Sequence, residues 1–448
     1  MTLPTNDTDA SSDPALLERA VRRTLWRLMP MLLLMYILAY LDRVNLGFAK
    51  QAYLRDTGLS EAAYAFGAGI FFIGYAVLEV PSNLILHRVG ARWWLSRIMV
   101  SWGLVAAAMA YAESEYVFYF LRFLLGITEA GFFPGVVYYL TYWFPHSVRG
   151  RAMGIFYFGP SLALSLGGPL SGLLLEMDSI AGYRGWQWMF LVEGLLASVV
   201  GVVAFFVLHD RPSEARWLPS DERGAIEAAI AKDSANAAHS SSSVLSALVR
   251  PRILSFATVY FLIQMSVYGV IFYLPSTLSA LIGRPTGWEV GVLSAIPWIG
   301  ALVASYTVPR FAGAGDRRGI VGAASLTAAS IGIAASASGD PFLGIVALCV
   351  AAAGFIAVQP IFWTFPTHEL RGAAAAGAIG LINALGNLGG FVAPNVRVWA
   401  ENFAAERSLS IRAPGLVVLA LTTLLGAVLF LLLARFSPGR VDRSAPKL

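Results

Sequence analysis

Charged residues are scarce in this 448-residue sequence: Asp, Glu, Lys and Arg make up 13% of it, whereas 57% of its residues are hydrophobic. About a quarter of the residues of a typical soluble domain are charged. The deficit excludes an ordinary soluble domain and indicates that lipid is the main solvent of the chain. The basic residues stand in short groups between apolar runs, which indicates membrane topology and argues against nucleic-acid binding.

Cysteine and histidine are also scarce. The single cysteine, Cys349, lies in an apolar run, which excludes a disulfide framework and a cysteine-based metal site. The five histidines show no metal-ligand spacing, and the sequence has no recognisable nucleophile–base constellation. We therefore expect no cofactor, no bound metal and no enzymatic activity.

Long apolar runs dominate what is present. Residues 1–18 are polar and acidic and do not fit a cleaved signal peptide, so the first run is expected to remain as a membrane span. A helix needs about 20 mostly apolar residues to cross about 30 Å of hydrocarbon. By this measure the sequence predicts an all-α integral membrane protein with twelve transmembrane helices, at 28–49, 62–86, 93–111, 116–140, 150–175, 188–208, 253–281, 288–309, 319–338, 341–365, 373–396 and 413–434.

Lysine and arginine are distributed unevenly between the two ends of these spans. If the N-terminus is cytoplasmic, 23 of the 32 basic residues flank the cytoplasmic ends and 7 flank the opposite ends, with Arg43 and Arg122 inside spans. Basic residues are enriched in cytoplasmic loops. The sequence thus predicts a multi-pass protein of the cell (inner) membrane with both termini in the cytoplasm.

One long polar segment separates the first six spans from the last six. It contains SDERGAIEAAIAKD, a predicted surface helix that Ser220 caps. We expect a cytoplasmic N-terminal segment, an N-terminal six-helix bundle, a cytoplasmic linker, a C-terminal six-helix bundle and a cytoplasmic tail, at 1–27, 28–208, 209–252, 253–436 and 437–448.

The two sets of spans repeat one pattern. Arg149-Gly150 opens the fifth span and Arg371-Gly372 opens the eleventh; 18 residues after each arginine comes a glycine pair, Gly167-Gly168 or Gly389-Gly390. One offset of 222 residues relates both matches, which favours an internal duplication over chance in a glycine-rich chain. Two pseudo-symmetric bundles are typical of transporters, whose substrate site lies at the bundle interface.

Four ionisable residues fall well inside predicted spans: Asp42 and Arg43 in the first, Arg122 and Glu129 in the fourth. A charge at a span centre costs about 2.5–3.5 kcal/mol on insertion scales, so these side chains should face the protein interior. Arg122 and Glu129 share one helix face, two turns apart, whereas Asp42 and Arg43 point about 100° apart. If Asp42 or Glu129 pairs with Arg122, the other arginine is free to hold an anion.

Burial favours the neutral form of a carboxylic acid, and a neighbouring arginine favours the ionised form. An anion that competes for the arginine would therefore change the proton affinity of the acid, which predicts proton coupling. The alternative is that these residues form structural ion pairs, or that Asp42 and Arg43 anchor the helix at the membrane interface. For Glu79 and Glu193, near span ends, we prefer the structural interpretation, with Glu79 placed where water reaches it.

The second half of the sequence has almost no charge inside its spans, so it should supply polar and aromatic contacts. The candidates are Gln264 and Tyr268, Asn383 and Asn387 (each pair four residues apart on one helix face), and Trp363. The alternative is that the amides bond neighbouring helices and the aromatic residues lie in interfacial belts.

Four segments of the first half, YLDRVNLGFA, GYAVLEVPSNLILHRVGAR, RFLLGITEAGFFPGVVYYLTYWFP and GWQWMFLVEG, resemble the anion:cation symporter branch of the major facilitator superfamily. The resemblance covers most of the chain, although the second half matches mainly by layout. It implies the major facilitator fold and transport of a small organic carboxylate such as a sugar acid, tartrate or an aromatic acid.

The resemblance also implies residue roles. Arg43 would bind the substrate carboxylate, Tyr75 would line the site, and Asp42, Arg122 and Glu129 would form the proton-linked set. His87 replaces the aspartate of the superfamily's loop between spans 2 and 3, and Asn83 its first glycine, so the gating ion pair of that loop does not carry over. The antiporter signature of the fifth span is also absent, because SLALSLGG follows Gly159-Pro160, and this argues against an exporter.

We therefore expect a monomeric secondary transporter that takes up a small organic carboxylate together with protons, by alternating access across the bilayer. The alternatives are an exporter, a sodium-coupled carrier, and a membrane sensor that binds its ligand without transporting it.

Overall fold

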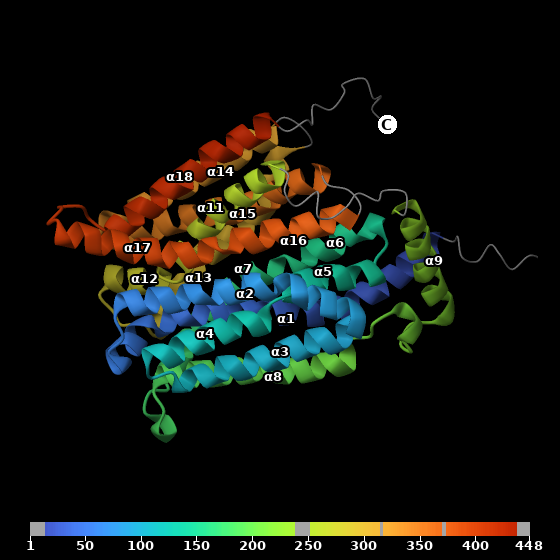
Figure 1. Ribbon diagram of the computed structural model, residues 1–448, viewed down its shortest axis with the longest axis horizontal. Coiled ribbons are helices and arrows are strands. Elements are labelled where there is room, and N and C mark those ends of the chain that lie inside the picture. Colours follow the sequence, from blue (N-terminus) through green and yellow to red (C-terminus); the bar gives the residue numbers. More distant parts are fainter. Residues whose placement is uncertain (1–13, 238–250, 314–316, 370–372, 437–448) are drawn as a thin grey trace, which may run out of the picture.

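The computed structural model describes residues 14–237, 251–313, 317–369 and 373–436, and within these every regular element is a helix. The helices run side by side along the long axis of the molecule, with α1–α8 gathered in one half and α11–α18 in the other (Figure 1). The main helices are α1 (Pro14–Thr57), α2 (Glu61–Val89), α3 (Ala91–Ala108), α4 (Glu115–Glu129), α5 (Phe132–Trp143), α6 (His146–Phe156), α7 (Phe158–Leu175), α8 (Gly185–Val207), α9 (Ser220–Ala237), α11 (Pro251–Ile271), α12 (Leu274–Ile282), α13 (Trp288–Ala312), α14 (Arg317–Ala335), α15 (Pro341–Glu369), α16 (Ala373–Asn387), α17 (Gly389–Glu406) and α18 (Pro414–Arg435).

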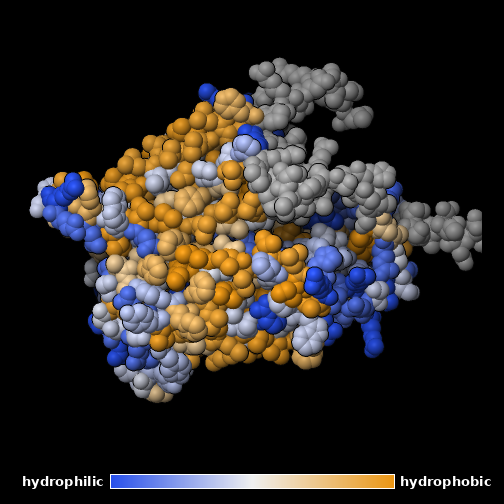
Figure 2. Space-filling model, viewed as in Figure 1, coloured by the Kyte–Doolittle hydropathy of each residue, from blue (hydrophilic) through white to orange (hydrophobic). Residues whose placement is uncertain are grey.

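Eleven helices or helix pairs of the described residues are long and apolar enough to cross a membrane, and they match eleven of the twelve predicted spans. The remaining prediction, 373–396, falls on α16 and α17, which meet at Leu388, so neither helix is a long apolar span by itself. Hydrophobic side chains form a broad band across the middle of the molecule, with hydrophilic side chains at its two ends (Figure 2). We call the end that carries α9 the linker end, and the end with the α1–α2 connection at Thr57–Glu61 the far end.

The fourth predicted span is broken inside the bundle. Glu129 is the last residue of α4, and Gly131, with φ of 86°, starts a new helix, α5. A left-handed φ favours glycine. Ser82 Oγ on α2 donates to the freed carbonyl of Ala130 (2.6 Å) and so satisfies it inside the membrane. The break leaves the Glu129 carboxylate at a helix end within the bundle.

The repeated glycine pairs both lie where the two bundles touch. A side chain on Gly168 in α7 would overlap Ser294 in α13, and one on Gly390 in α17 would overlap the Phe72 ring in α2. The fifth span thus meets the eighth, and the eleventh meets the second, which are equivalent contacts under the repeat. Arg371-Gly372 of the repeat lies outside the described residues.

Helices α2 and α4 approach each other closely within the N-terminal half. A Cβ atom on Gly126 would overlap the backbone oxygen of Phe71, whereas one on Gly300 in α13 would meet nothing within 4 Å. We expect Gly126→Ala to lower stability by about 1–3 kcal/mol, because rigid backbone cannot yield to the added methyl group. Gly300→Ala is the control and should be neutral or slightly stabilising. Thermal unfolding of the detergent-purified variants measures both, and equal melting temperatures would contradict the prediction.

The linker helix α9 starts at Ser220, where the sequence predicts a surface helix, and it docks on the N-terminal half. Glu222 lies 3.3 Å from Arg23 of α1, and the Asp233 carboxylate accepts the backbone N–H of His146 (2.6 Å). Trp217, just before α9, stacks on Trp143. The outer parts of the predicted N-terminal segment, linker and tail, 1–13, 238–250 and 437–448, lie outside the described residues.

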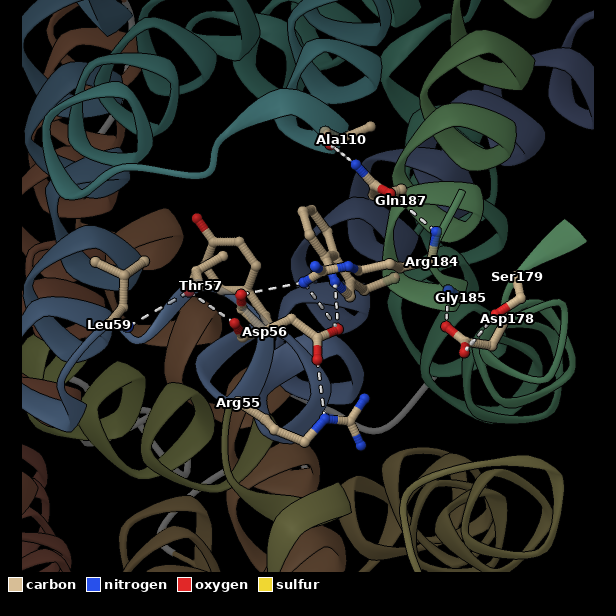
Figure 3. Close-up of polar contacts among 12 residues, drawn as sticks. Arg55, Asp56, Thr57, Leu59, Ala110, Asp178, Ser179, Arg184, Gly185 and Gln187 are labelled. Carbon is tan, nitrogen blue, oxygen red and sulfur yellow. Dashed lines mark hydrogen bonds and ion pairs between the residues drawn. The ribbon is translucent and has the colours of Figure 1, made fainter. Parts of the chain in front are cut away.

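At the far end, Asp56 ties the last turn of α1 to the first turn of α8 (Figure 3). Its carboxylate accepts a hydrogen bond from Trp186 Nε1 (3.1 Å) and lies 2.9 Å from Arg55 Nε and 3.5 Å from Arg184 Nη1. One carboxylate thus balances two arginines within a single bundle, so this end of the N-terminal half is internally braced.

Candidate functional site

A cavity of about 740 Å³ lies between the two bundles. Its walls come from α1, α2, α5, α6 and α7 on one side and from α11, α13, α15 and α16 on the other. It extends from Arg43, in α1, to Gly150 and Arg151, which begin the fifth span beside the linker end. A cavity of this size between two bundles suits a small organic molecule.

The bundles close against each other at the far end. Ser279 Oγ of α12 donates to Gln51 Oε1 of α1 (3.1 Å), and the backbone N–H of Trp288 donates to Glu176 Oε1 (3.0 Å). The Gly47 backbone in α1 is so near the carbonyl of Ile271 in α11 that an added Cβ would lie 2.9 Å from it. The cavity therefore communicates with the linker end and is sealed from the far end.

Arginine supplies all the charge in the described lining of this cavity, at Arg43 and Arg151. Six tyrosines also line it: Tyr36, Tyr40, Tyr75, Tyr157, Tyr260 and Tyr306. The guanidinium of Arg43 lies 4.8 Å from the ring centre of Tyr40 and 5.7 Å from that of Tyr75, within cation–π range. A positively charged, hydroxyl-rich wall fits an anionic ligand that carries further polar groups.

Behind the wall, Arg43 forms an ion pair with Glu129, and both side chains are buried. The sequence left open whether Glu129 or Asp42 pairs with Arg122, and it left Arg43 free; the structure pairs Glu129 with Arg43 instead. Arg43 Nη1 also lies 3.5 Å from the Tyr268 hydroxyl of α11. The arginine thus contacts the cavity, a buried carboxylate and the opposite bundle at once.

Arg122 is held by backbone acceptors of α2 and forms no ion pair with Glu129 among the described residues. Its Nε and Nη2 donate to the carbonyl oxygens of Gly67 and Ala68 in α2, each at 3.2 Å. Asp42 accepts a hydrogen bond from Asn45 (3.3 Å) through Oδ1, while its buried Oδ2 has no hydrogen-bond partner among the described residues. Asp42 and Arg122 therefore form no direct ion pair in this structure.

A hydrogen-bonded chain of amides crosses the seam between the bundles. Asn383 Nδ2 donates to Glu79 Oε1 (2.7 Å), Asn387 Nδ2 donates to the Asn383 carbonyl (3.0 Å), and Gln264 Nε2 donates to Asn387 Oδ1 (2.9 Å). The prediction that water reaches Glu79 is wrong, because this side chain is buried at the seam. Glu193 does make a structural contact, accepting a hydrogen bond from Ser171 (2.9 Å).

The structure divides the predicted site residues into two layers. Five line the cavity: Arg43, Tyr75, Trp363, Asn383 and Asn387. The other five lie outside the described lining. Two of them, Gln264 and Tyr268, contact lining residues from behind. The remaining three, Asp42, Arg122 and Glu129, are buried in the N-terminal half.

Sequence reasoning missed several lining residues, above all Tyr36, Tyr40 and Tyr260. A signal for the first two was present. Tyr36, Tyr40 and Arg43 stand at i, i+4 and i+7, so they share one face of α1 with the proposed substrate arginine. Tyr36 stacks on Phe156, with ring centres 4.2 Å apart, which fixes it at the cavity wall.

Comparison with known proteins agrees with this architecture. Residues 32–394 match the family model of the Major Facilitator Superfamily. The chain is 47% identical over 415 residues to the inner membrane transport protein RhmT of Escherichia coli, covering 93% of this chain and 95% of that protein. It is 40% identical over 443 residues to a putative tartrate transporter of Agrobacterium vitis, covering 98% and 94%.

A third relative is a quinolone resistance transporter of Acinetobacter baumannii, 38% identical over 415 residues, covering 91% of this chain and 93% of that protein. Two helical bundles around a central cavity and near full-length similarity to transport proteins together establish the family. The chain belongs to the Major Facilitator Superfamily and is a membrane transporter and not an enzyme, and its relatives are consistent with the anion:cation symporter branch that its motifs resemble.

Proposed function

We propose that this protein takes up a small organic carboxylate together with protons, by alternating access. The observation that carries the proposal is the position of Arg43, which reaches the cavity on one side and the buried Glu129 carboxylate on the other. A substrate carboxylate that binds Arg43 competes with Glu129 for the same guanidinium. Protonation of Glu129 removes that competition, so proton binding and substrate binding favour each other.

Asp42 and Arg122 complete the proton-linked set in this proposal. Asp42 precedes Arg43 in the sequence and is buried, and its Oδ2 has no hydrogen-bond partner among the described residues. A buried carboxylate with an unpaired oxygen is a suitable site for a proton. Arg122, held by the carbonyls of α2, supplies a fixed positive charge to the same region.

Substrate selection would rest on the remaining lining residues. Tyr75 and Trp363 offer aromatic faces, and Asn383 and Asn387 offer amides to hydroxyl groups. Gln264 and Tyr268 would act indirectly, by fixing Asn387 and Arg43. The relative described as a putative tartrate transporter supports a hydroxylated carboxylate as the substrate.

The transport cycle would move the segments 28–208 and 253–436 relative to each other as two bundles. The excess of basic residues at the linker end supports a cytoplasmic location for this end and for both termini. The structure, sealed at the far end, then corresponds to the inward-facing state of a monomeric inner-membrane carrier. The opposite state would open the far end to admit the substrate.

A thermal-shift screen followed by flux measurement tests the proposal. Purified protein is screened against tartrate, gluconate and benzoate, because a ligand at 100 times its dissociation constant adds about 2.7 kcal/mol of stability. The best ligand is then offered, radiolabelled, to proteoliposomes with a pH gradient (acid outside). We expect accumulation that a protonophore abolishes. Uptake driven by a sodium gradient and indifferent to the pH gradient would contradict proton coupling.

An exporter is the second candidate, favoured by the relative described as a quinolone resistance transporter and by the aromatic cavity wall. Cells that express the protein separate the two functions. An exporter lowers the cellular content of norfloxacin when the protein is induced, whereas the proposed importer leaves it unchanged and raises the content of the carboxylate.

A further inference from the structure

Two cations from opposite bundles meet at one tyrosine ring near the sealed far end. The ammonium of Lys50, on α1, lies 4.5 Å from the ring centre of Tyr273. The guanidinium of Arg397, on α17, lies 3.9 Å from the same ring centre. Tyr273 follows α11 and precedes α12, so the ring and Arg397 belong to one bundle and Lys50 to the other.

The acids near these cations lie closer to solvent than the cations do. The side chains of Lys50 and Arg397 are 9% and 14% exposed, whereas those of Glu61 and Glu401 are 56% and 43% exposed. Lys50 Nζ contacts Glu61 Oε2 at 2.7 Å, but Arg397 Nε lies 3.9 Å from Glu401 Oε1, beyond hydrogen-bond distance. The two cations therefore lie deeper in the protein than the carboxylates of Glu61 and Glu401.

Two buried polar atoms of this cluster lack a hydrogen-bond partner among the described residues: Arg397 Nη1 and the Tyr273 hydroxyl. A buried donor without an acceptor costs about 1–3 kcal/mol. The neighbouring arginines of the far end are satisfied differently, because Arg55 and Arg184 share the Asp56 carboxylate (Figure 3). At Tyr273 and Arg397 the donors are present and an acceptor is missing, whereas the adjacent Lys50 is paired with Glu61.

We propose that Lys50, Tyr273 and Arg397 form a second anion site, which binds the carboxylate of the substrate at the far-end entrance before it reaches Arg43. Lys50 and Arg397 lie on different bundles, so opening of the far end widens the space between them. A carboxylate in that space accepts hydrogen bonds from both cations and from the tyrosine hydroxyl. In the sealed state the cations close on the Tyr273 ring instead. This inference rests on the proposed function, in which substrate enters from the far end.

Sided transport kinetics test the site. Proteoliposomes with uniformly oriented protein are loaded or bathed with the radiolabelled carboxylate identified in the tartrate, gluconate and benzoate panel, and half-saturation is measured separately from each face. We expect Arg397→Gln to raise half-saturation from the far-end face about tenfold, the loss of one charge-assisted contact worth about 1.4 kcal/mol. Half-saturation from the linker-end face should change less than about twofold, because the cavity and Arg43 are untouched.

Salt and matched variants separate an anion site from a gate. In the open state Lys50 and Arg397 would face solvent, where salt screens their attraction for an anion, so half-saturation at the far-end face should rise with ionic strength in the wild type and less so in Arg397→Gln. Arg407→Gln, which removes the same charge from an exposed far-end arginine, should leave both faces unchanged. Arg397→Lys keeps the charge and should stay near wild type, which guards against a variant that only misfolds.

Each outcome decides the proposal. Equal shifts of half-saturation at both faces, or shifts of opposite sign, would show that Arg397 only biases closure, and they would overturn the site while leaving the proposed function intact. A wild-type protein that transports no carboxylate in either direction would overturn the proposed function and this site with it. A far-end shift that disappears at high salt supports both.

Discussion

Arg43→Ala is expected to weaken carboxylate binding severely and to abolish transport. Arg43 provides positive charge at the inner end of the cavity lining, at the point where the sealed far end begins. A charge-assisted hydrogen bond that is lost from a buried site costs about 1.5–3 kcal/mol, and the unpaired Glu129 carboxylate that remains repels an anion as well. We expect affinity to fall at least about a hundredfold, which a thermal-shift titration with the transported carboxylate measures.

The controls for this variant come from the same cavity. Arg151 also lines it, but beside the linker end, and Arg151→Ala should change affinity by less than about threefold. Because Arg43→Ala leaves a buried charge unpaired, the double variant with Glu129→Gln tests whether lost folding explains the result. A double variant that is stable but does not bind supports the role of Arg43 in the site. Retained affinity in Arg43→Ala would refute that role.

Glu129→Gln is expected to abolish proton-driven accumulation of the substrate while counterflow exchange continues. Without an ionisable group at this position, coupling to the pH gradient is lost, so accumulation should fall to the equilibrium level. Counterflow exchange need not release the proton and should continue at a substantial fraction of the wild-type rate. Proteoliposomes measured in both modes provide the comparison, with the pH gradient imposed only in the first.

Glu193→Gln is the matched control, since Glu193 is also a buried acid of the N-terminal half but contacts Ser171 behind the cavity. It should leave both modes close to wild type. If Glu129→Gln reduces accumulation and exchange equally, Glu129 has a structural role and the proton is carried elsewhere, with Asp42 the next candidate.

The spans and their grouping were predictable because a bilayer constrains sequence strongly. About twenty consecutive apolar residues predict a membrane span whichever helices pack against it, and the uneven distribution of lysine and arginine predicts the orientation. Even the contacts between bundles had a sequence signal in the repeated pairs at Gly168 and Gly390. The helix break at Gly131 was not predicted, because a single glycine inside a predicted span does not by itself indicate a break, and this break depends on Ser82 from another helix.

The partners of the buried charges were not predictable in the same way. Helical spacing places Arg122 and Glu129 on one face of α4, but it does not reveal that carbonyls of α2 attract the guanidinium. Glu79 is a second example. Its place in the sequence predicts its depth in the membrane, whereas its burial depends on Asn383, which lies about 300 residues later in the other bundle. Pairing across helices depends on tertiary geometry that periodicity does not contain.

The docking of α9 has a practical meaning for measurements on this protein. Glu222 and Asp233 attach the linker helix to α1 and to the start of α6, so α9 should move together with the N-terminal bundle. The chain has a single native cysteine, so a spectroscopic label on the exposed Ala228 needs only Cys349 replaced. With a second label on the exposed Ile320 of α14, the distance between the two labels would report the angle between the two bundles.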